Sequence, residues 1–191
     1  DAGSQKIGEF LDVKPGMRVV DACAGAGGKT LHLAALMENK GQIIAMDIHG
    51  WKLAELKRRA KRAGAHNIET REITDNKVIK RLHEKADRLL IDAPCSGLGV
   101  LKRNPDSKWK IDQDFIDRIR KEQETILQDY SKIIKKGGKM VYATCSILPS
   151  ENNEQVENFL KNNSDFKLIK EEKVMPSTGF DGFYMALIER V

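Results

Sequence analysis

The sequence predicts an α/β fold with a mainly parallel β-sheet and helices on both of its faces. Short apolar runs alternate with amphipathic stretches along most of the chain, which is the pattern of strands joined by crossover helices. Four of the apolar runs end at a polar residue: Asp21, Asp47, Asp92 and Thr144. Right-handed crossovers bring the carboxyl ends of parallel strands to one edge of the sheet, where α/β proteins bind ligands. We therefore expect the functional residues at that edge.

The expected elements follow from the spacing of apolar residues and from glycine breaks. Strands are expected at residues 17–20, 42–46, 67–72, 88–91 and 139–143. Helices are expected at residues 29–38, 51–63, 77–84, 112–135 and 150–162. Gly137 and Gly138 are expected to end the fourth helix, and Ser150 to cap the fifth, with Glu151 in its first turn. Residues 166–169 and 182–188 have no helix between them, so a final hairpin with one antiparallel strand is predicted.

Composition and charge restrict the class of protein. The 191 residues, 40% of them hydrophobic, suffice for one domain with its own core. A net charge of +5 favours a polyanionic partner such as nucleic acid. Three cysteines without disulfide or zinc spacing indicate a reducing cytoplasm and no metal site. No apolar run is long enough to span a bilayer, and no pattern indicates an obligate interface, so we expect a monomer without a membrane partner.

A glycine-rich run, residues 21–30 with the sequence DACAGAGGKT, joins the first expected strand to the first expected helix. Glycines let a ligand approach the backbone closely, and free amides at the start of a helix attract negative groups. The glycine spacing fits neither the phosphate loop G-x-x-x-x-G-K-[ST] nor a clean G-x-G-x-x-G. The run therefore predicts a nucleotide cofactor without naming it.

Two acids after later strands narrow the choice of cofactor. Asp47 closes the second expected strand, where a carboxylate accepts hydrogen bonds from a ribose diol; alternatively, it caps the following helix. Asp75 follows the third strand, as an acceptor for an adenine amino group or as a simple turn residue. Ribose and adenine contacts beside a glycine turn fit NAD or S-adenosylmethionine.

Two cysteines are expected at the same sheet edge as the glycine-rich run: Cys95 in Asp-Ala-Pro-Cys-Ser-Gly and Cys145 in Ala-Thr-Cys-Ser. A lone buried cysteine is usually an inert core residue, and Cys23 is interpreted as one. Two thiols beside a cofactor loop instead favour covalent chemistry. A thiolate that adds to carbon 6 of cytosine makes carbon 5 nucleophilic toward a methyl sulfonium, and loss of the carbon 5 proton and then of the thiol restores the ring. Asp92 could hold the base while charge develops, and the residues alone do not say which thiol attacks.

The longest irregular stretch, residues 98–110, follows Cys95 closely. It carries four cationic side chains and an aromatic ring: Lys102, Arg103, Lys108, Lys110 and Trp109. The stretch is either a solvated surface loop or a segment that contacts phosphates and bases. Its place beside Cys95 favours the second interpretation.

Together these motifs resemble those of the Fmu/Sun-type RNA cytosine-5 methyltransferases, over nearly the whole chain. The matching segments are residues 1–5, 21–30, 92–97, 104–106, 108–109, 123, 142–146, 151–152 and 181–183. The pairing of the Asp-Ala-Pro-Cys-Ser-Gly run with the Thr-Cys-Ser run is highly specific, whereas either run alone would be less so.

The resemblance implies a class I, Rossmann-like methyltransferase fold that uses S-adenosylmethionine and acts on RNA, with ribosomal RNA expected. It implies that Cys145 is the nucleophile and that Cys95 assists release of the methylated RNA. Asp92 and Lys29 complete the catalytic residues that it implies. The cofactor-binding residues that it implies are Cys23, Ala24, Gly25, Ala26, Gly27, Gly28, Lys29, Asp47, Asp75 and Asp92.

The chain departs from the family pattern in three ways. Ala26 stands where the family usually has proline, and Lys102 stands where it often has arginine. Family members also usually carry an N-terminal extension or RNA-binding domain, so residues 1–191 are expected to be one catalytic domain from a longer protein. The alternatives are a non-catalytic RNA-binding or ribosome-assembly protein on the same scaffold, a methyltransferase with another acceptor, and an NAD-dependent enzyme.

Overall fold

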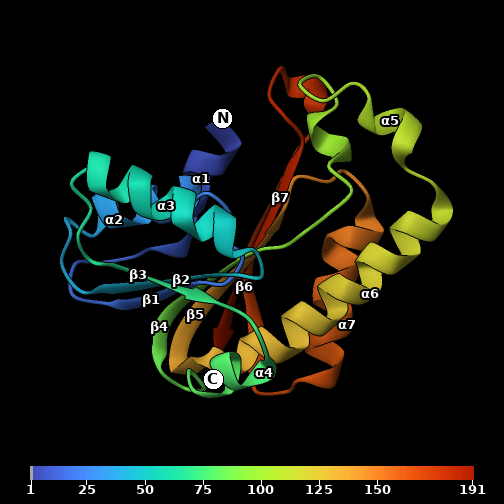
Figure 1. Cartoon of the computed structure of the whole chain (residues 1–191). Helices are drawn as coiled ribbons and strands as arrows, with labels where there is room; N and C mark the ends of the chain where they lie inside the picture. Colours follow the sequence, from blue (N-terminus) through green and yellow to red (C-terminus); the bar gives the residue numbers. More distant parts are fainter. Residues whose placement is uncertain (1) are drawn as a thin grey trace.

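The computed structural model describes residues 2–191 as one seven-stranded sheet flanked by helices (Figure 1). The strand order is β3-β2-β1-β4-β5-β7-β6. Five strands are parallel to one another: β1 (Arg18–Asp21), β2 (Gln42–Asp47), β3 (Ile68–Glu72), β4 (Ala86–Asp92) and β5 (Ile134–Thr144). The hairpin of β6 (Phe166–Val174) and β7 (Phe183–Arg190) completes the sheet, with β7 antiparallel to both neighbours. The predicted fold class and the antiparallel strand near the C-terminus are confirmed.

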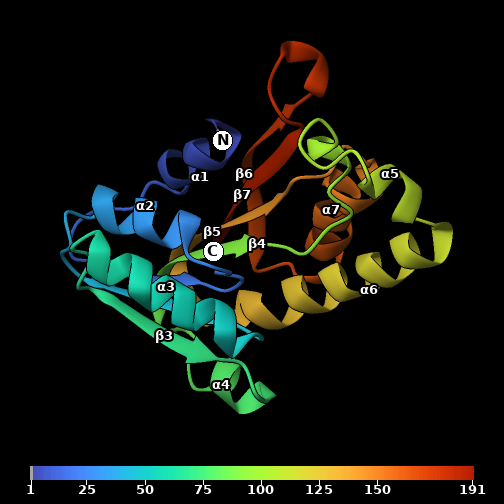
Figure 2. The same cartoon turned by 45° about the horizontal axis from the view of Figure 1, so that its top comes forward.

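Helices cover both faces of the sheet (Figures 1 and 2). One face carries α1 (Ala2–Leu11), α2 (Gly28–Leu36) and α3 (Gly50–Arg62), and the other carries α4 (Asn76–Lys80), α6 (Gln113–Tyr130) and α7 (Asn153–Asn162). Neighbouring strand residues belong to different cores, because alternate side chains point to opposite faces. Val19, Ile43 and Leu90 pack on the α1–α2 side, whereas Val20, Ile44 and Leu89 pack on the α6–α7 side. The central strands are therefore buried on both faces, as parallel strands are.

The sequence prediction places the end of the helix at residues 112–135 too late. α6 ends at Tyr130, a 3₁₀ turn covers Ser131–Ile133, and β5 begins at Ile134. Ile134 pairs with Ala86 of β4, and the register then shifts before Lys139 pairs with Arg88. Gly137, with φ 73°, lies inside this irregular strand start and does not end a helix. The sheet pairing overrides the local glycine signal.

Three further elements differ from the predictions. α1 was not expected, although Ile7, Phe10 and Leu11 have helical spacing and are buried. Ser150 does not cap a helix, since it lies in a 3₁₀ turn, Pro149–Glu151, and α7 begins only at Asn153. The 98–110 segment is not wholly irregular, because it contains a 3₁₀ turn at Leu98–Val100 and α5 (Ser107–Lys110). Asp1, in the first matching segment, lies outside the described residues.

The 98–110 segment and the β6–β7 connection stand side by side at the carboxyl edge of the sheet (Figure 2). Gly99 donates its N–H to the Cys145 carbonyl at 2.9 Å, and Gly182 donates to the Gly99 carbonyl at 2.7 Å. A Cβ atom on Gly99 would lie 2.2 Å from the Gly182 oxygen, so only glycine permits this approach. Arg103 also pairs with Asp181 at 2.5 Å. These contacts join three chain segments around Cys145.

Candidate active site

Two cavities open at the carboxyl edge of the sheet, on either side of Asp92. The first, here called the loop cavity, has a volume of about 320 Å³ and lies over the ends of β1 and β2. Its lining is Ala22, Cys23, Gly25, Asp47, Ile48, His49, Lys52, Ile73, Asp92, Pro94, Glu122, Ile126 and Tyr130. The second, here called the thiol cavity, has a volume of about 590 Å³. Its lining is Lys29, Asp92, Ala93, Pro94, Cys95, Val100, Arg103, Asn104, Cys145 and Phe183. Asp92 and Pro94 line both cavities, so a molecule in one lies beside a molecule in the other.

The glycine-rich run forms the tight turn that its composition predicts. Gly25 and Gly27 have φ values of 54° and 84°, which favour glycine. A Cβ atom on Gly27 would lie 2.4 Å from the Leu56 side chain, so the turn packs directly on α3. The Ala26 carbonyl accepts a hydrogen bond from Arg59 at 2.8 Å. α2 then begins at Gly28, with its first amides at the edge of the sheet.

Asp47 connects this turn to the end of β2. Its carboxylate accepts hydrogen bonds from the Gly25 amide at 2.9 Å and from the His49 amide at 2.8 Å. The residue is 7% exposed and lines the loop cavity. The alternative role as a helix cap is not what the structure shows, since the N-cap position of α3 is His49. Its assignment to ribose stays a prediction.

Asp75 lies apart from the loop cavity. It is exposed, occupies the N-cap of α4, and accepts a hydrogen bond from the Lys77 amide at 2.8 Å. Ile73, two residues earlier, does line the cavity. The adenine contact of Asp75 stays a prediction, and the capping role is the one that the geometry displays.

Cys95 and Cys145 meet in the thiol cavity, with their sulfur atoms 3.3 Å apart. The hydrogen bond between them lowers the pKa of Cys145, and the Lys29 ammonium lowers it further. The same hydrogen bond raises the pKa of Cys95, and burial adds to that rise. The thiolate is the reactive form of cysteine, so the lower pKa of Cys145 agrees with the predicted nucleophile. Because either sulfur could donate in this contact, the order of the two roles stays a prediction.

Lys29 and Asp92 form an ion pair between the two cavities, with Nζ and Oδ2 2.6 Å apart. Burial raises the pKa of Asp92, although Lys29 opposes that rise. Both residues come from the ends of elements that the sequence places at this edge: Asp92 from β4 and Lys29 from the first turn of α2. The structure thus brings together all four predicted catalytic residues: Lys29, Asp92, Cys95 and Cys145.

Sequence reasoning missed the role of Asp21, which is fully buried at the end of β1. Thr30 donates to Asp21 Oδ2 at 2.7 Å, whereas Oδ1 has no hydrogen-bond partner. Burial raises the pKa of Asp21 from 3.8 to about 7, and the charge of Asp92 contributes to the rise. Thr30 and Asp21 both lie in the glycine-rich run, so their contact fixes the start of α2 on the end of β1.

The raised pKa of Asp21 predicts a pH dependence of stability. An acid whose pKa is higher in the folded state binds more protons than in the unfolded chain at intermediate pH, so stability falls as pH rises. Between pH 3.8 and about 7, Asp21 should lower the free energy of unfolding by about 1.4 kcal/mol per pH unit. The free energy of unfolding of Asp21→Asn, measured with urea at several pH values across this window, should fall less steeply with pH than that of the wild type. Asp106→Asn, at an exposed position, serves as the control, and equal slopes in all three proteins would refute the prediction.

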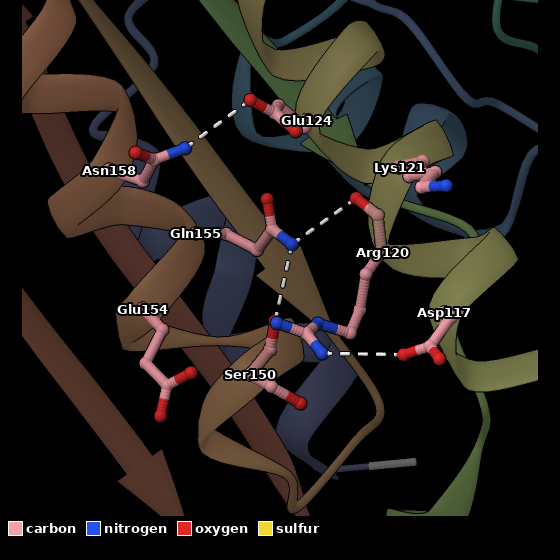
Figure 3. Close-up of a pocket in the computed structure, with 8 residues that line it drawn as sticks. All are labelled: Asp117, Arg120, Lys121, Glu124, Ser150, Glu154, Gln155 and Asn158. Carbon is pink, nitrogen blue, oxygen red and sulfur yellow. Dashed lines mark hydrogen bonds and ion pairs between the residues drawn. The ribbon is translucent and has the colours of Figure 1, made fainter. Parts of the chain in front are cut away.

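A third cavity lies between α6 and α7 and contains none of the predicted site residues (Figure 3). Its volume is about 440 Å³, and its lining mixes acidic and basic side chains. Gln155 crosses it and donates to the Arg120 and Ser150 carbonyls, each at 3.2 Å. The contacts of this groove therefore hold the Pro149–Glu151 turn against α6.

In the part of the chain that the structure describes, no group of His, Cys, Asp and Glu is arranged to hold a metal ion, and none of the helices described could cross a membrane.

The strand order and the glycine-rich turn after β1 form a Rossmann-like fold, which a SAM dependent methyltransferase from Aquifex aeolicus shares with a TM-score of 0.67 at 15% identity, covering 98% of this chain and 89% of that one. The chain belongs to the family described as 16S rRNA methyltransferase RsmB/F, which matches residues 9–188. The resemblance found in the sequence is thereby confirmed.

Individual proteins show the same relationship. "Probable ribosomal RNA small subunit methyltransferase B" of Synechocystis sp. is 40% identical over 169 residues, which are 87% of this chain and 38% of that relative. The protein of the same description from Bacillus subtilis is 38% identical over 168 residues, again 87% of this chain and 38% of the relative. The crystal structure of NSun6 from Pyrococcus horikoshii with SFG has a TM-score of 0.88 at 29% identity, covering 99% of this chain and 52% of that one. The chain thus spans well under half the length of these two curated relatives.

Proposed function

We propose that the chain transfers a methyl group from S-adenosylmethionine to carbon 5 of a cytosine in RNA, and that the RNA is ribosomal. The observation that carries the proposal is the pair of thiols, 3.3 Å apart, in a cavity that shares Asp92 with the loop cavity. The family and its relatives support the class of reaction and the kind of RNA. We also propose that the reaction takes place in the cytoplasm, with the protein acting as a monomer.

In this proposal the loop cavity holds the cofactor. Backbone amides of the glycine-rich run would face the ligand, and the Asp47 carboxylate would accept hydrogen bonds from its ribose hydroxyls. The thiol cavity holds the cytosine, whose target carbon then lies beside Asp92, at the boundary of the two cavities. Arg103 of the 98–110 segment lines the thiol cavity, and the same segment carries Lys102 and Lys108, which suit contact with the phosphates around the target base.

In the proposed reaction, the Cys145 thiolate adds to carbon 6 and makes carbon 5 nucleophilic. Carbon 5 takes the methyl group, and the Lys29–Asp92 pair stabilises the charge that develops on the base. Transfer of the carbon 5 proton to solvent water and expulsion of the Cys145 sulfur as a thiolate then restore the ring. Cys95, as the proposed donor to that sulfur, is placed to stabilise the leaving thiolate through its hydrogen bond.

The acceptor atom can be tested directly, because methylation at carbon 5 displaces the hydrogen there. Ribosomal RNA carrying tritium at carbon 5 of its cytosines should release tritium to water in step with methyl incorporation from the cofactor. Nucleoside analysis of the product should show 5-methylcytidine. Methyl incorporation with full retention of tritium would assign another acceptor atom. Binding of RNA without any methyl incorporation would instead support the non-catalytic alternative, a ribosome-assembly protein.

A further inference from the structure

Glu151 is a fully buried carboxylate that the proposed reaction does not use. It ends the 3₁₀ turn Pro149–Glu151, between β5 and α7. Two hydroxyls donate to its Oε1: those of Ser96 at 2.5 Å and Ser146 at 2.6 Å. Oε2 accepts from the Ser96 amide at 2.7 Å and from the Gln123 amide group at 3.1 Å. Four donors converging on one carboxylate satisfy it completely, as burial of an acceptor-only group requires.

The two serines that bind Glu151 each follow one of the thiols. Ser96 comes directly after Cys95, and Ser146 directly after Cys145, on loops fifty residues apart in the chain. Gln123 also donates to the Pro94 carbonyl at 2.9 Å, so both neighbours of Cys95 are held. One carboxylate therefore connects the two loops whose sulfur atoms are in contact.

The turn that carries Glu151 is itself held from several directions. Tyr142 of β5 donates its hydroxyl to the Glu151 carbonyl at 2.8 Å. Asn152 accepts from Thr144 at 2.5 Å and donates to the Ser146 carbonyl at 3.0 Å. From the groove side, Gln155 joins the turn to α6 (Figure 3). A carboxylate fixed in this way can position the two serines, because the Tyr142 and Gln155 contacts hold its turn without them.

We propose that Glu151 is a positioning residue that holds the Cys95 and Cys145 loops together and so keeps the two thiols in hydrogen-bond contact. What the thiols do chemically rests on the proposed function, but the contact between them does not. The proposal can therefore be tested on the free protein, without RNA or cofactor.

The test compares Glu151→Gln and Ser146→Ala with the wild type. Glutamine keeps the volume of glutamate, but its NH₂ group is a donor and cannot accept the hydrogen bonds that the carboxylate oxygen accepts. Alanine at residue 146 removes one of the four contacts and little volume. Ser131→Ala is the matched control, because Ser131 is also buried but bonds to the Gln128 carbonyl at the far end of α6.

The measurement is the pH dependence of Cys145 alkylation by iodoacetamide, quantified for the Cys145 peptide by mass spectrometry. The neighbouring groups that shift the pKa of the Cys145 thiol are Cys95, Asp92 and Lys29. Neither substitution removes a contact of Asp92 or Lys29. We expect the alkylation midpoint of Cys145 to rise by about one pH unit in Glu151→Gln and Ser146→Ala, which is about tenfold less thiolate at neutral pH. Ser131→Ala should keep the wild-type midpoint.

An unchanged midpoint in folded Glu151→Gln would overturn the proposal and leave Glu151 with a purely structural role. If Glu151→Gln does not fold, the alkylation midpoint of Ser146→Ala tests the proposal in its place, and an unchanged midpoint would again overturn it. Methyl transfer to RNA is measured separately. A shifted midpoint in a protein whose wild type transfers no methyl group would refute the proposed function and leave the positioning role in place.

Discussion

Cys145→Ala is expected to abolish methyl transfer, whereas Cys95→Ala is expected to accumulate a covalent protein–RNA adduct. Without the Cys145 sulfur no bond forms to carbon 6, so the rate should fall by on the order of 10⁴-fold or more. Without Cys95 the bond still forms, but the leaving sulfur loses the donor that lies 3.3 Å away. Denaturing gels of each variant with substrate RNA and cofactor should show a retarded band for Cys95→Ala and none for Cys145→Ala.

The double variant supplies the control for this experiment. If the trapped bond runs through Cys145, then a protein with alanine at both positions should give no retarded band. An adduct in Cys145→Ala and none in Cys95→Ala would reverse the two roles. The lowered pKa of Cys145 and the raised pKa of Cys95 agree with the order that the family resemblance implies.

The sequence predicted which residues meet at the carboxyl edge of the sheet, because the pattern of the strands determines where each strand ends. Once the strands at Asp21, Asp47, Asp92 and Thr144 are parallel, their polar ends must meet. The approach of Cys95 to Cys145 follows from this, since β4 and β5 are neighbours in the sheet. Their contact distance and their unequal acidity depend on side-chain geometry, which no pattern contains.

Local signals failed where distant residues supply the partner. Glu151 follows a serine and precedes a helix, so helix-capping rules place it in an exposed first turn. Its partners are instead Ser146, five residues earlier, and the distant Ser96 and Gln123. Likewise, Asp21 ends a strand as predicted, but the sequence pattern does not show that it is fully buried. Glu151 and Asp21 are both polar groups that lie in the interior, where local propensity does not place them.

Asp92→Asn is expected to lower the rate of methyl transfer by about 10²–10³-fold. The amide keeps the shape of the side chain but removes both the acid and the charge that holds Lys29 at 2.6 Å. Single-turnover assays at saturating cofactor measure the loss. Asp87→Asn is the matched control, because Asp87 lies at the other end of the same strand and is also paired with a lysine, Lys135. That variant should retain a rate within about twofold of the wild type.

A second measurement separates an effect on the substrate from an effect on the thiol. The charge of Asp92 raises the pKa of Cys145, whereas the Lys29 ammonium lowers it. Removal of the Asp92 charge should therefore lower the pKa of Cys145 further, so alkylation of Cys145 at neutral pH should become faster while methyl transfer becomes slower. This opposite response is the signature of an acid that acts on the base itself. If alkylation and methyl transfer slowed together, Asp92 would act through Cys145 instead, and its assignment to the base would fail.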